Sequence, residues 1–114
     1  MSNYHFLLTY SVKAQYPSLE DDVKKANKVR DKIADISQWD KLENVETTFK
    51  GSIYLNDFDS IQTKKNDAVK EIKNNFLPIL KECQSGRLDV RIDCAMLVDG
   101  LGECLMFEVI NDEN

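Results

Sequence analysis

The sequence predicts an α+β protein of the ferredoxin-like type, with two helices on one face of an antiparallel sheet. Two stretches of helical periodicity alternate with strand-like stretches in the order β-α-β-β-α-β, and one extra C-terminal β-strand follows. The length of 114 residues suits one domain. We expect residues 1–110 to form this domain and residues 111–114, "NDEN", to be an acidic tail.

The first expected element is a strand over residues 4–12, "YHFLLTYSV". It reads as apolar or aromatic on both faces, which is typical of a central strand that is covered on both sides. Because the helices cover only one face, something else must cover the other. A second copy of the chain is the simplest candidate, so we expect a homodimer.

A long amphipathic helix is expected next. Ser18 is in position to cap it, with Asp21 at the third helical position. Apolar side chains recur every three or four residues from Leu19 to Ile36, while four lysines fall outside this stripe.

The middle of the chain, residues 37–57, is rich in β-forming residues. We expect two short strands, about residues 42–49 and 51–55, with a turn or bulge near Gly51. A polar connection follows, and Asp59 or Ser60 is expected to cap the second helix.

The second helix carries an apolar stripe from Val69 to Cys83 and contains Pro78, which predicts a kink or an end and restart. Gly86 is the expected C-terminal stop. Residues 87–98 alternate between apolar and polar side chains, which predicts a strand. Residues 99–102, "DGLG", predict a tight turn, and residues 103–110 are expected to form the last strand, antiparallel to the one before.

Composition narrows the possible partners. The formal charge of −5 argues against a broad phosphate-binding surface, so a protein partner is favoured over nucleic acid. Three cysteines without CxxC spacing, with a single histidine, predict free thiols rather than a zinc site or disulfides. No apolar run approaches the ~20 residues of a membrane span and the start resembles no signal peptide, so we expect a cytoplasmic protein without membrane association.

Three features carry a family resemblance: the strand "LLTYSV", the β-rich stretch "LENVETTFKGSIYL" before the second helix, and the terminal hairpin. Together they resemble the small ferredoxin-like dimers related to the second CRISPR-associated adaptation protein, which include SinR-like proteins and the GhoS-type antitoxin. In metal-dependent members of this group, an Asp at the end of the first strand holds a divalent ion at the dimer axis. The matching residue here is Ser11, so the resemblance implies the scaffold without this metal ligand.

Other candidate sites have ordinary structural explanations. His5 has no nucleophile or orienting carboxylate near it in the sequence. Asp57 and Asp59 are too few for a calcium loop, and a cap is the simpler role for Asp59. The alternation of Asp89, Arg91 and Asp93 is typical of a solvated or cross-strand-paired face.

The stretch "KGSIYLN" loosely matches the RNA-binding strand of recognition sheets through Lys50, Gly51 and Tyr54, but the other stacking aromatics are missing. We therefore predict no catalytic, metal or cofactor site. Tyr10, Ser11, Trp39 and Tyr54 are candidates for the dimer axis or an interaction surface, and core packing of Trp39 is the open alternative.

The leading hypothesis is a small non-catalytic dimer of antitoxin, immunity or inhibitor type that binds another macromolecule. The alternative is a metal-dependent endoribonuclease of the CRISPR-associated or GhoS-like type, using other carboxylates such as Asp57, Asp59 or Asp99. A sensor with a small-molecule pocket between the sheet and a dimer partner is a third possibility. Whether the chain is an enzyme stays open.

Overall fold

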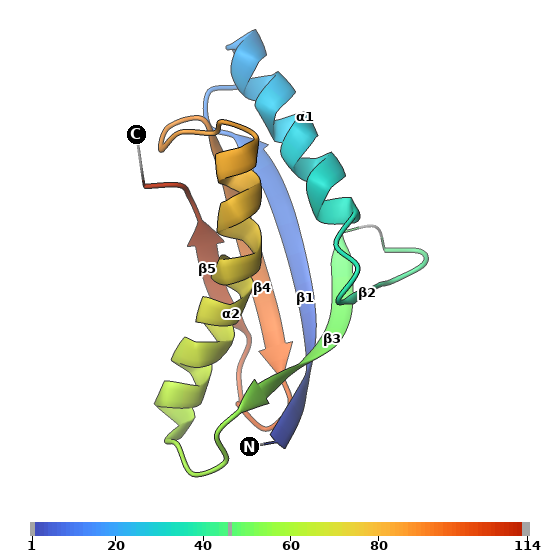
Figure 1. Ribbon diagram of the computed structural model, residues 1–114, viewed down its shortest axis with the longest axis vertical. Coiled ribbons are helices and arrows are strands. Elements are labelled where there is room, and N and C mark those ends of the chain that lie inside the picture. Colours follow the sequence, from blue (N-terminus) through green and yellow to red (C-terminus); the bar gives the residue numbers. More distant parts are fainter. Residues whose placement is uncertain (1, 46, 113–114) are drawn as a thin grey trace.

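In the computed structural model, which describes residues 2–45 and 47–112, two helices pack on one face of a five-stranded antiparallel sheet (Figure 1). The predicted α+β class is confirmed. In chain order the elements are β1 (Ser2–Ala14), α1 (Glu20–Ala34), β2 (Asp40–Lys41), β3 (Thr48–Leu55), α2 (Ile61–Glu82), β4 (Val90–Val98) and β5 (Leu105–Val109).

The sheet has the strand order β2-β3-β1-β4-β5, and every neighbouring pair is antiparallel. β1 is central and long enough to pair with β3 through its first part and with β4 through its second part. The two-residue strand β2 pairs only with Phe49 and Lys50. Among the described residues, β3 therefore has a free edge from Gly51 onward.

β1 alternates between an apolar and a mainly polar face. Four of its helix-facing side chains are buried: Phe6, Leu8, Tyr10 and Val12. The outward positions are exposed and polar except for Leu7. The expectation that β1 is apolar on both faces is therefore wrong. Successive strand residues point to opposite sides, so the dense run of apolar letters resolves into one covered face and one open face.

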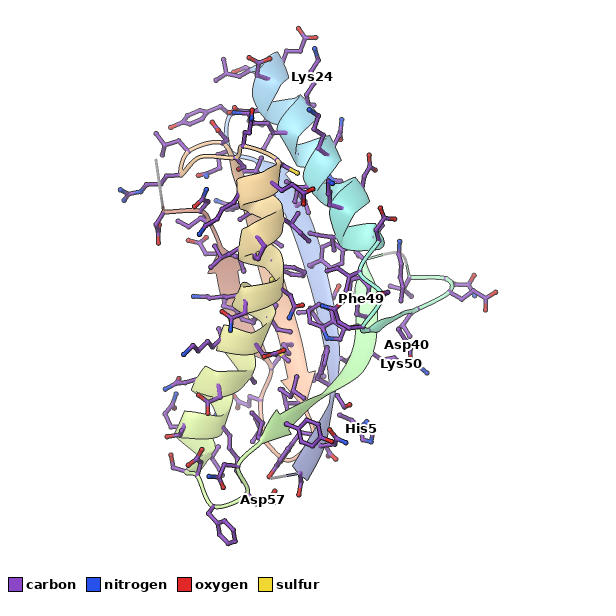
Figure 2. All side chains as sticks on the ribbon, viewed as in Figure 1. His5, Lys24, Asp40, Phe49, Lys50 and Asp57 are labelled. Atoms are coloured by element: carbon purple, nitrogen blue, oxygen red, sulfur yellow. The ribbon has the colours of Figure 1, made fainter. Side chains whose placement is uncertain are left out.

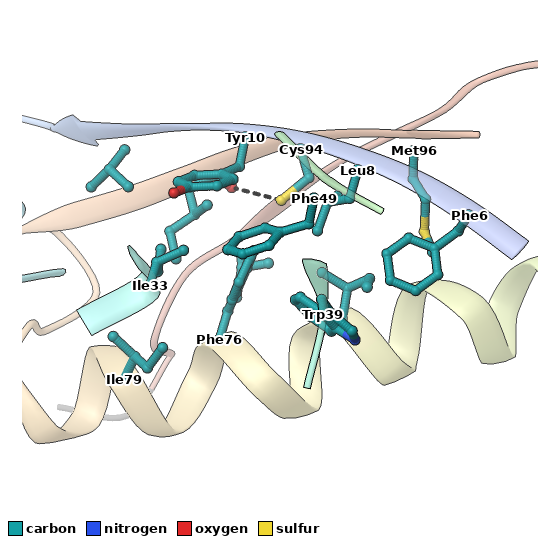
Figure 3. Packing of buried hydrophobic residues seen from close by; sticks show 14 of the residues in the cluster. Phe6, Leu8, Tyr10, Ile33, Trp39, Phe49, Phe76, Ile79, Cys94 and Met96 are labelled. Atoms are coloured by element: carbon teal, nitrogen blue, oxygen red, sulfur yellow. Dashed lines mark hydrogen bonds between the residues drawn. The ribbon is translucent and has the colours of Figure 1, made fainter. Parts of the chain in front are cut away.

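The core contains a cluster of aromatic rings that joins β1, β3, α2 and the connection after α1 (Figure 3). The ring of Tyr10 stacks on Phe49 with centroids 5.7 Å apart. Trp39 meets Phe6, Phe49 and Phe76 edge-on at 5.5, 5.6 and 6.0 Å. Edge-on and offset contacts at these separations are favourable because ring edges are positive and ring faces negative.

The start of α1 differs from the prediction. Leu19 is the N-cap residue and no side chain caps the helix, so the expected Ser18 cap is wrong. Ala26, Val29 and Ile33 are buried, whereas Leu19 and Val23 are exposed. The first turn of α1 extends past the end of the sheet, so these two side chains are only partly covered (Figure 1).

α2 is capped as predicted, since the backbone N–H of Thr63 donates to Ser60 Oγ at 3.1 Å. The helix continues through the exposed Pro78, so it does not end and restart there. It ends before Gly86, because Gln84 adopts the left-handed conformation with φ of 57°. The backbone N–H of Ser85 then donates to the Leu80 carbonyl at 2.9 Å, closing a Schellman motif.

The middle strands differ from the prediction. Residues 42–47 are not a strand, and β3 runs through Gly51 without interruption. Gly51 is needed for close packing, because a Cβ there would lie 2.8 Å from Phe6 Cζ and 3.0 Å from Trp39 Cδ1. The predicted "DGLG" turn is confirmed, with Gly100 and Gly102 at φ of 76° and 82°.

The end of the chain is anchored at least as far as Asn111. This residue, the first of the expected tail, is buried, and its Nδ2 donates to the Ser85 carbonyl at 2.9 Å. The last two residues of that tail lie outside the described part. No helix in residues 2–45 and 47–112 has both the length and the apolar character that crossing a bilayer requires.

Candidate interaction face

The sheet face that points away from both helices, here called the outer face, is the main candidate for a functional surface. Both helices lie on the opposite side of the sheet (Figure 1). Outward positions of β1, β3, β4 and β5 are mostly exposed or half-buried. An open face of this kind on an antiparallel sheet is stable in water when it is polar, so its apolar residues need an explanation.

Four apolar side chains form one patch at the centre of the outer face. Leu7 lies directly opposite Leu97 across β1 and β4, and Ala95 lies directly opposite Met106 across β4 and β5. Leu7, Leu97 and Met106 are 42%, 49% and 75% exposed. We call these four residues the outer apolar patch. Their register makes them neighbours, so the patch is continuous.

Charged residues border the patch at the end of β1. Asp93 Oδ2 lies 3.2 Å from Lys13 Nζ on the neighbouring strand, and Asp93 Oδ1 lies 3.2 Å from Arg91 Nε. Glu108 lies directly opposite Asp93 on β5. For Asp93 the sequence-based expectation of a cross-strand-paired face is confirmed. An apolar centre with a charged border is the usual arrangement of a protein interface.

The four candidate residues separate into two exposed and two buried positions. Ser11 lies on the outer face opposite Asp93, and Tyr54 lies opposite Asn3 with 68% of its surface exposed. Tyr10 and Trp39 are buried in the aromatic cluster, and burial raises the pKa of the Tyr10 hydroxyl. Core packing, the open alternative for Trp39, is what the structure shows.

The carboxylates that could serve a nuclease do not form a metal site in the described part of the chain, where no three His, Cys, Asp or Glu side chains are grouped to hold an ion. Asp57 instead has a structural role, because Ser2 Oγ and Tyr4 Oη donate to it at 2.7 and 2.9 Å. These hydrogen bonds lower the pKa of Asp57 and tie the start of β1 to the connection after β3.

His5 is exposed on the outer face and lies directly opposite Ser52. This placement agrees with an exposed His that has no catalytic partner. It also puts the single histidine beside a pocket at the free edge of β3, which the sequence did not predict.

A charged cluster around the buried Asp22, beneath the first turn of α1, was not predicted from the sequence either. Asp22 is only 4% exposed, and its Oδ2 has no hydrogen-bond partner among the described residues. Asp89 Oδ2 accepts from Lys25 Nζ at 2.9 Å and from the Gly86 N–H at 2.8 Å. A signal existed, because Asp22 lies on the stripe that continues with Ala26 and buries one side of the helix.

No protein-family model, curated protein or solved structure matches this chain.

Proposed function

We propose that this chain is a small interaction protein of regulatory type that forms a homodimer through the outer face and binds a protein partner. The observation that carries the proposal is the outer apolar patch, a continuous apolar surface at the centre of an uncovered sheet face. Patches of this kind mark association surfaces in soluble proteins.

A ferredoxin-like scaffold is part of the same proposal. α1 connects β1 to β2, and β3 lies between these two strands in the sheet. β1 in turn lies between β3 and β4. These relationships support a split βαβ arrangement, to which β5 would add one strand beyond β4. The outer face would then be the side of the scaffold that a second copy covers.

The size of the outer face supports a dimer of moderate strength. Four strands spaced by about 4.8 Å and averaging about eight residues span roughly 20 Å by 25 Å, on the order of 500 Å². Standard interfaces bury about 800 Å² per partner, so a contact through this face alone is small. A two-fold axis through the patch would bury Leu7 and Leu97 of both copies against each other. We therefore expect dissociation in the micromolar range.

Sedimentation velocity from about 1 to 200 μM tests the dimer. The wild type should shift from monomer to dimer, and Leu97→Asp should remain a monomer because it places a charge in the centre of the contact. Leu88→Asp is the matched control, since Leu88 is 59% exposed but precedes β4 and lies outside the outer face. A wild type that stays monomeric throughout, or equal effects of the two variants, would contradict the proposal.

The protein partner is supported by the net charge of −5, which disfavours a phosphate-binding surface and favours a basic protein. Capture experiments on host lysate, with and without nuclease treatment, separate the two classes of partner. We expect the same defined protein to be retained after nuclease treatment and to be released as salt rises. Loss of all binding after nuclease treatment would indicate a nucleic-acid partner instead.

A further inference from the structure

A pocket of about 510 Å³ opens at the free edge of β3, and we call it the edge pocket. It forms because β2 covers the edge of β3 only as far as Lys50, leaving the strand without a neighbour on that side from Gly51 onward among the described residues. Its lining includes Phe6, Gln38 and four polar side chains from the strands: His5, Asp40, Lys50 and Ser52.

Strand register brings these four side chains together from three separate strands. Ser52 lies directly opposite His5 across β3 and β1, and Lys50 lies directly opposite Asp40 across β3 and β2. Lys50 and Ser52 are two residues apart, so they point to the same side of β3. Figure 2 shows His5, Asp40 and Lys50 along this edge, away from both helices.

None of these four side chains takes part in a hydrogen bond or ion pair within residues 2–45 and 47–112. Lys50 and Asp40 do not pair with each other although they are directly opposite. Lys13 and Asp93, on the same sheet, do pair at 3.2 Å. A positive group, a negative group and two hydrogen-bonding groups are therefore available to a ligand in one pocket.

We propose that the edge pocket binds a zwitterionic small molecule of amino-acid type. The carboxylate of the ligand pairs with Lys50 and accepts hydrogen bonds from Ser52 and His5, and its ammonium group pairs with Asp40. A ligand with both signs of charge leaves neither Lys50 nor Asp40 facing a like charge. A simple anion would face the repulsion of Asp40, and a simple cation that of Lys50.

The floor of the pocket suits the apolar part of such a ligand. Gly51 has no side chain, and the Phe6 ring packs closely behind it. The polar groups are exposed, so each ion pair adds little. For about ten ligand atoms in an open pocket we expect a Kd of about 1 mM. The pocket borders the outer apolar patch, since Lys50 lies directly opposite Leu7, so binding to a monomeric chain is what separates this proposal from the dimer.

The first experiment is titration of the ¹⁵N-labelled full chain with each of the standard amino acids up to about 20 mM, followed by NMR. At least one should shift the amide signals of Gly51, Ser52 and Asp40 with saturation. The absence of any saturable shift in these signals would overturn the proposal.

The second experiment separates the two charges of the ligand. For leucine, 4-methylpentanoate lacks only the ammonium group and 3-methylbutylamine lacks only the carboxylate; the tightest amino acid is compared with its own pair of analogues. We expect both analogues to bind at least about threefold more weakly. If either analogue binds as tightly as the amino acid itself, one of the two proposed charge contacts is not made. That result would overturn zwitterion recognition.

Variants locate the site. Lys50→Gln and Asp40→Asn should each weaken binding about threefold to fivefold. Lys24→Gln is the control for lost charge, since Lys24 lies on the first turns of α1, far from the pocket (Figure 2). All three positions are exposed, and the dispersion of the NMR spectrum verifies folding. An equal loss in Lys24→Gln would mean that binding is nonspecific and would overturn the site. If the chain stays monomeric but still binds an amino acid in the edge pocket, the dimer proposal is contradicted and the pocket proposal is supported.

Discussion

The buried Asp22, in the first turn of α1, lies beside the half-buried Asp89, which precedes β4 and pairs with Lys25. Burial raises the pKa of Asp22, and the negative charge of Asp89 raises it further. The hydrogen bond from Lys25 lowers the pKa of Asp89, so Asp89 holds the negative charge. Asp22 is therefore the more readily protonated carboxyl of the pair and Asp89 the more readily ionised one.

Asp22→Asn should stabilise the protein at neutral pH. Because the folded-state pKa of Asp22 lies above its unfolded value near 4, its contribution to stability is full below that value and is lost as pH rises through the folded pKa. The amide of Asn is neutral at every pH, so it brings no buried charge and does not repel Asp89. Urea unfolding at pH 4 and pH 7 should show that the free energy of unfolding of Asp22→Asn exceeds that of wild type by more at pH 7 than at pH 4. Asp21→Asn, in the same turn, is the matched control and should show no such trend; a loss of stability at pH 7 in Asp22→Asn would contradict the raised pKa of Asp22.

Asp89→Asn should have the opposite effect. The variant loses the carboxylate that accepts from Lys25 and from the Gly86 N–H, at a cost of about 1–3 kcal/mol at pH 7. The folded-state pKa of Asp89 is lowered, so its contribution is present above the unfolded value near 4 and is lost as pH falls through the folded pKa. The difference in free energy of unfolding between Asp89→Asn and wild type, measured with urea, should therefore become smaller at acidic pH.

The control for this experiment is Asp31→Asn, an exposed position on α1. It should change the free energy of unfolding by no more than about 0.5 kcal/mol. A pH-independent loss in Asp89→Asn would show that the carboxylate acts through packing rather than through its charge.

Gly51→Ala should destabilise the fold although alanine suits a strand better than glycine. The added Cβ would lie 2.8 Å from Phe6 Cζ, so buried rings must shift. Overpacking of this kind costs about 1–3 kcal/mol. Gly86→Ala is the comparison, since its nearest atom, Asp89 Oδ2, is at an ordinary 3.4 Å. Urea midpoints of the two variants test the expectation, and equal midpoints would show that the rings move aside freely.

The two serines that precede helices should respond differently to substitution. Ser60→Ala removes the side chain that accepts from the Thr63 N–H and should cost about 1 kcal/mol. Ser18→Ala should have almost no effect, because α1 has no side-chain cap. Thermal unfolding midpoints of Ser60→Ala and Ser18→Ala, each compared with wild type, test this prediction. A large effect of Ser18→Ala would support the cap expected from the sequence against the observed helix start.

Local patterns explain which parts of the fold could be predicted. In β1, the even-numbered positions from Phe6 to Val12 are apolar and the odd-numbered positions are polar except for Leu7. This alternation indicates one open face, and the expectation of two apolar faces overlooked it. The cap at Ser60 and the glycine turn depend on neighbouring residues alone, and both predictions are confirmed. The middle strands could not be placed in this way, because β2 has only two residues and depends on its pairing with β3.

By itself, the sequence determined the α+β class, the order of the main elements and the amphipathic character of both helices, because these depend on periodicity along a few turns or one strand. Tertiary structure decided which distant residues meet. Gly51 meets Phe6 and Trp39, Asp22 meets Asp89, and His5 meets Ser52 only after strand register is set. Register and burial depend on contacts between segments far apart in the chain, so no local pattern specifies them.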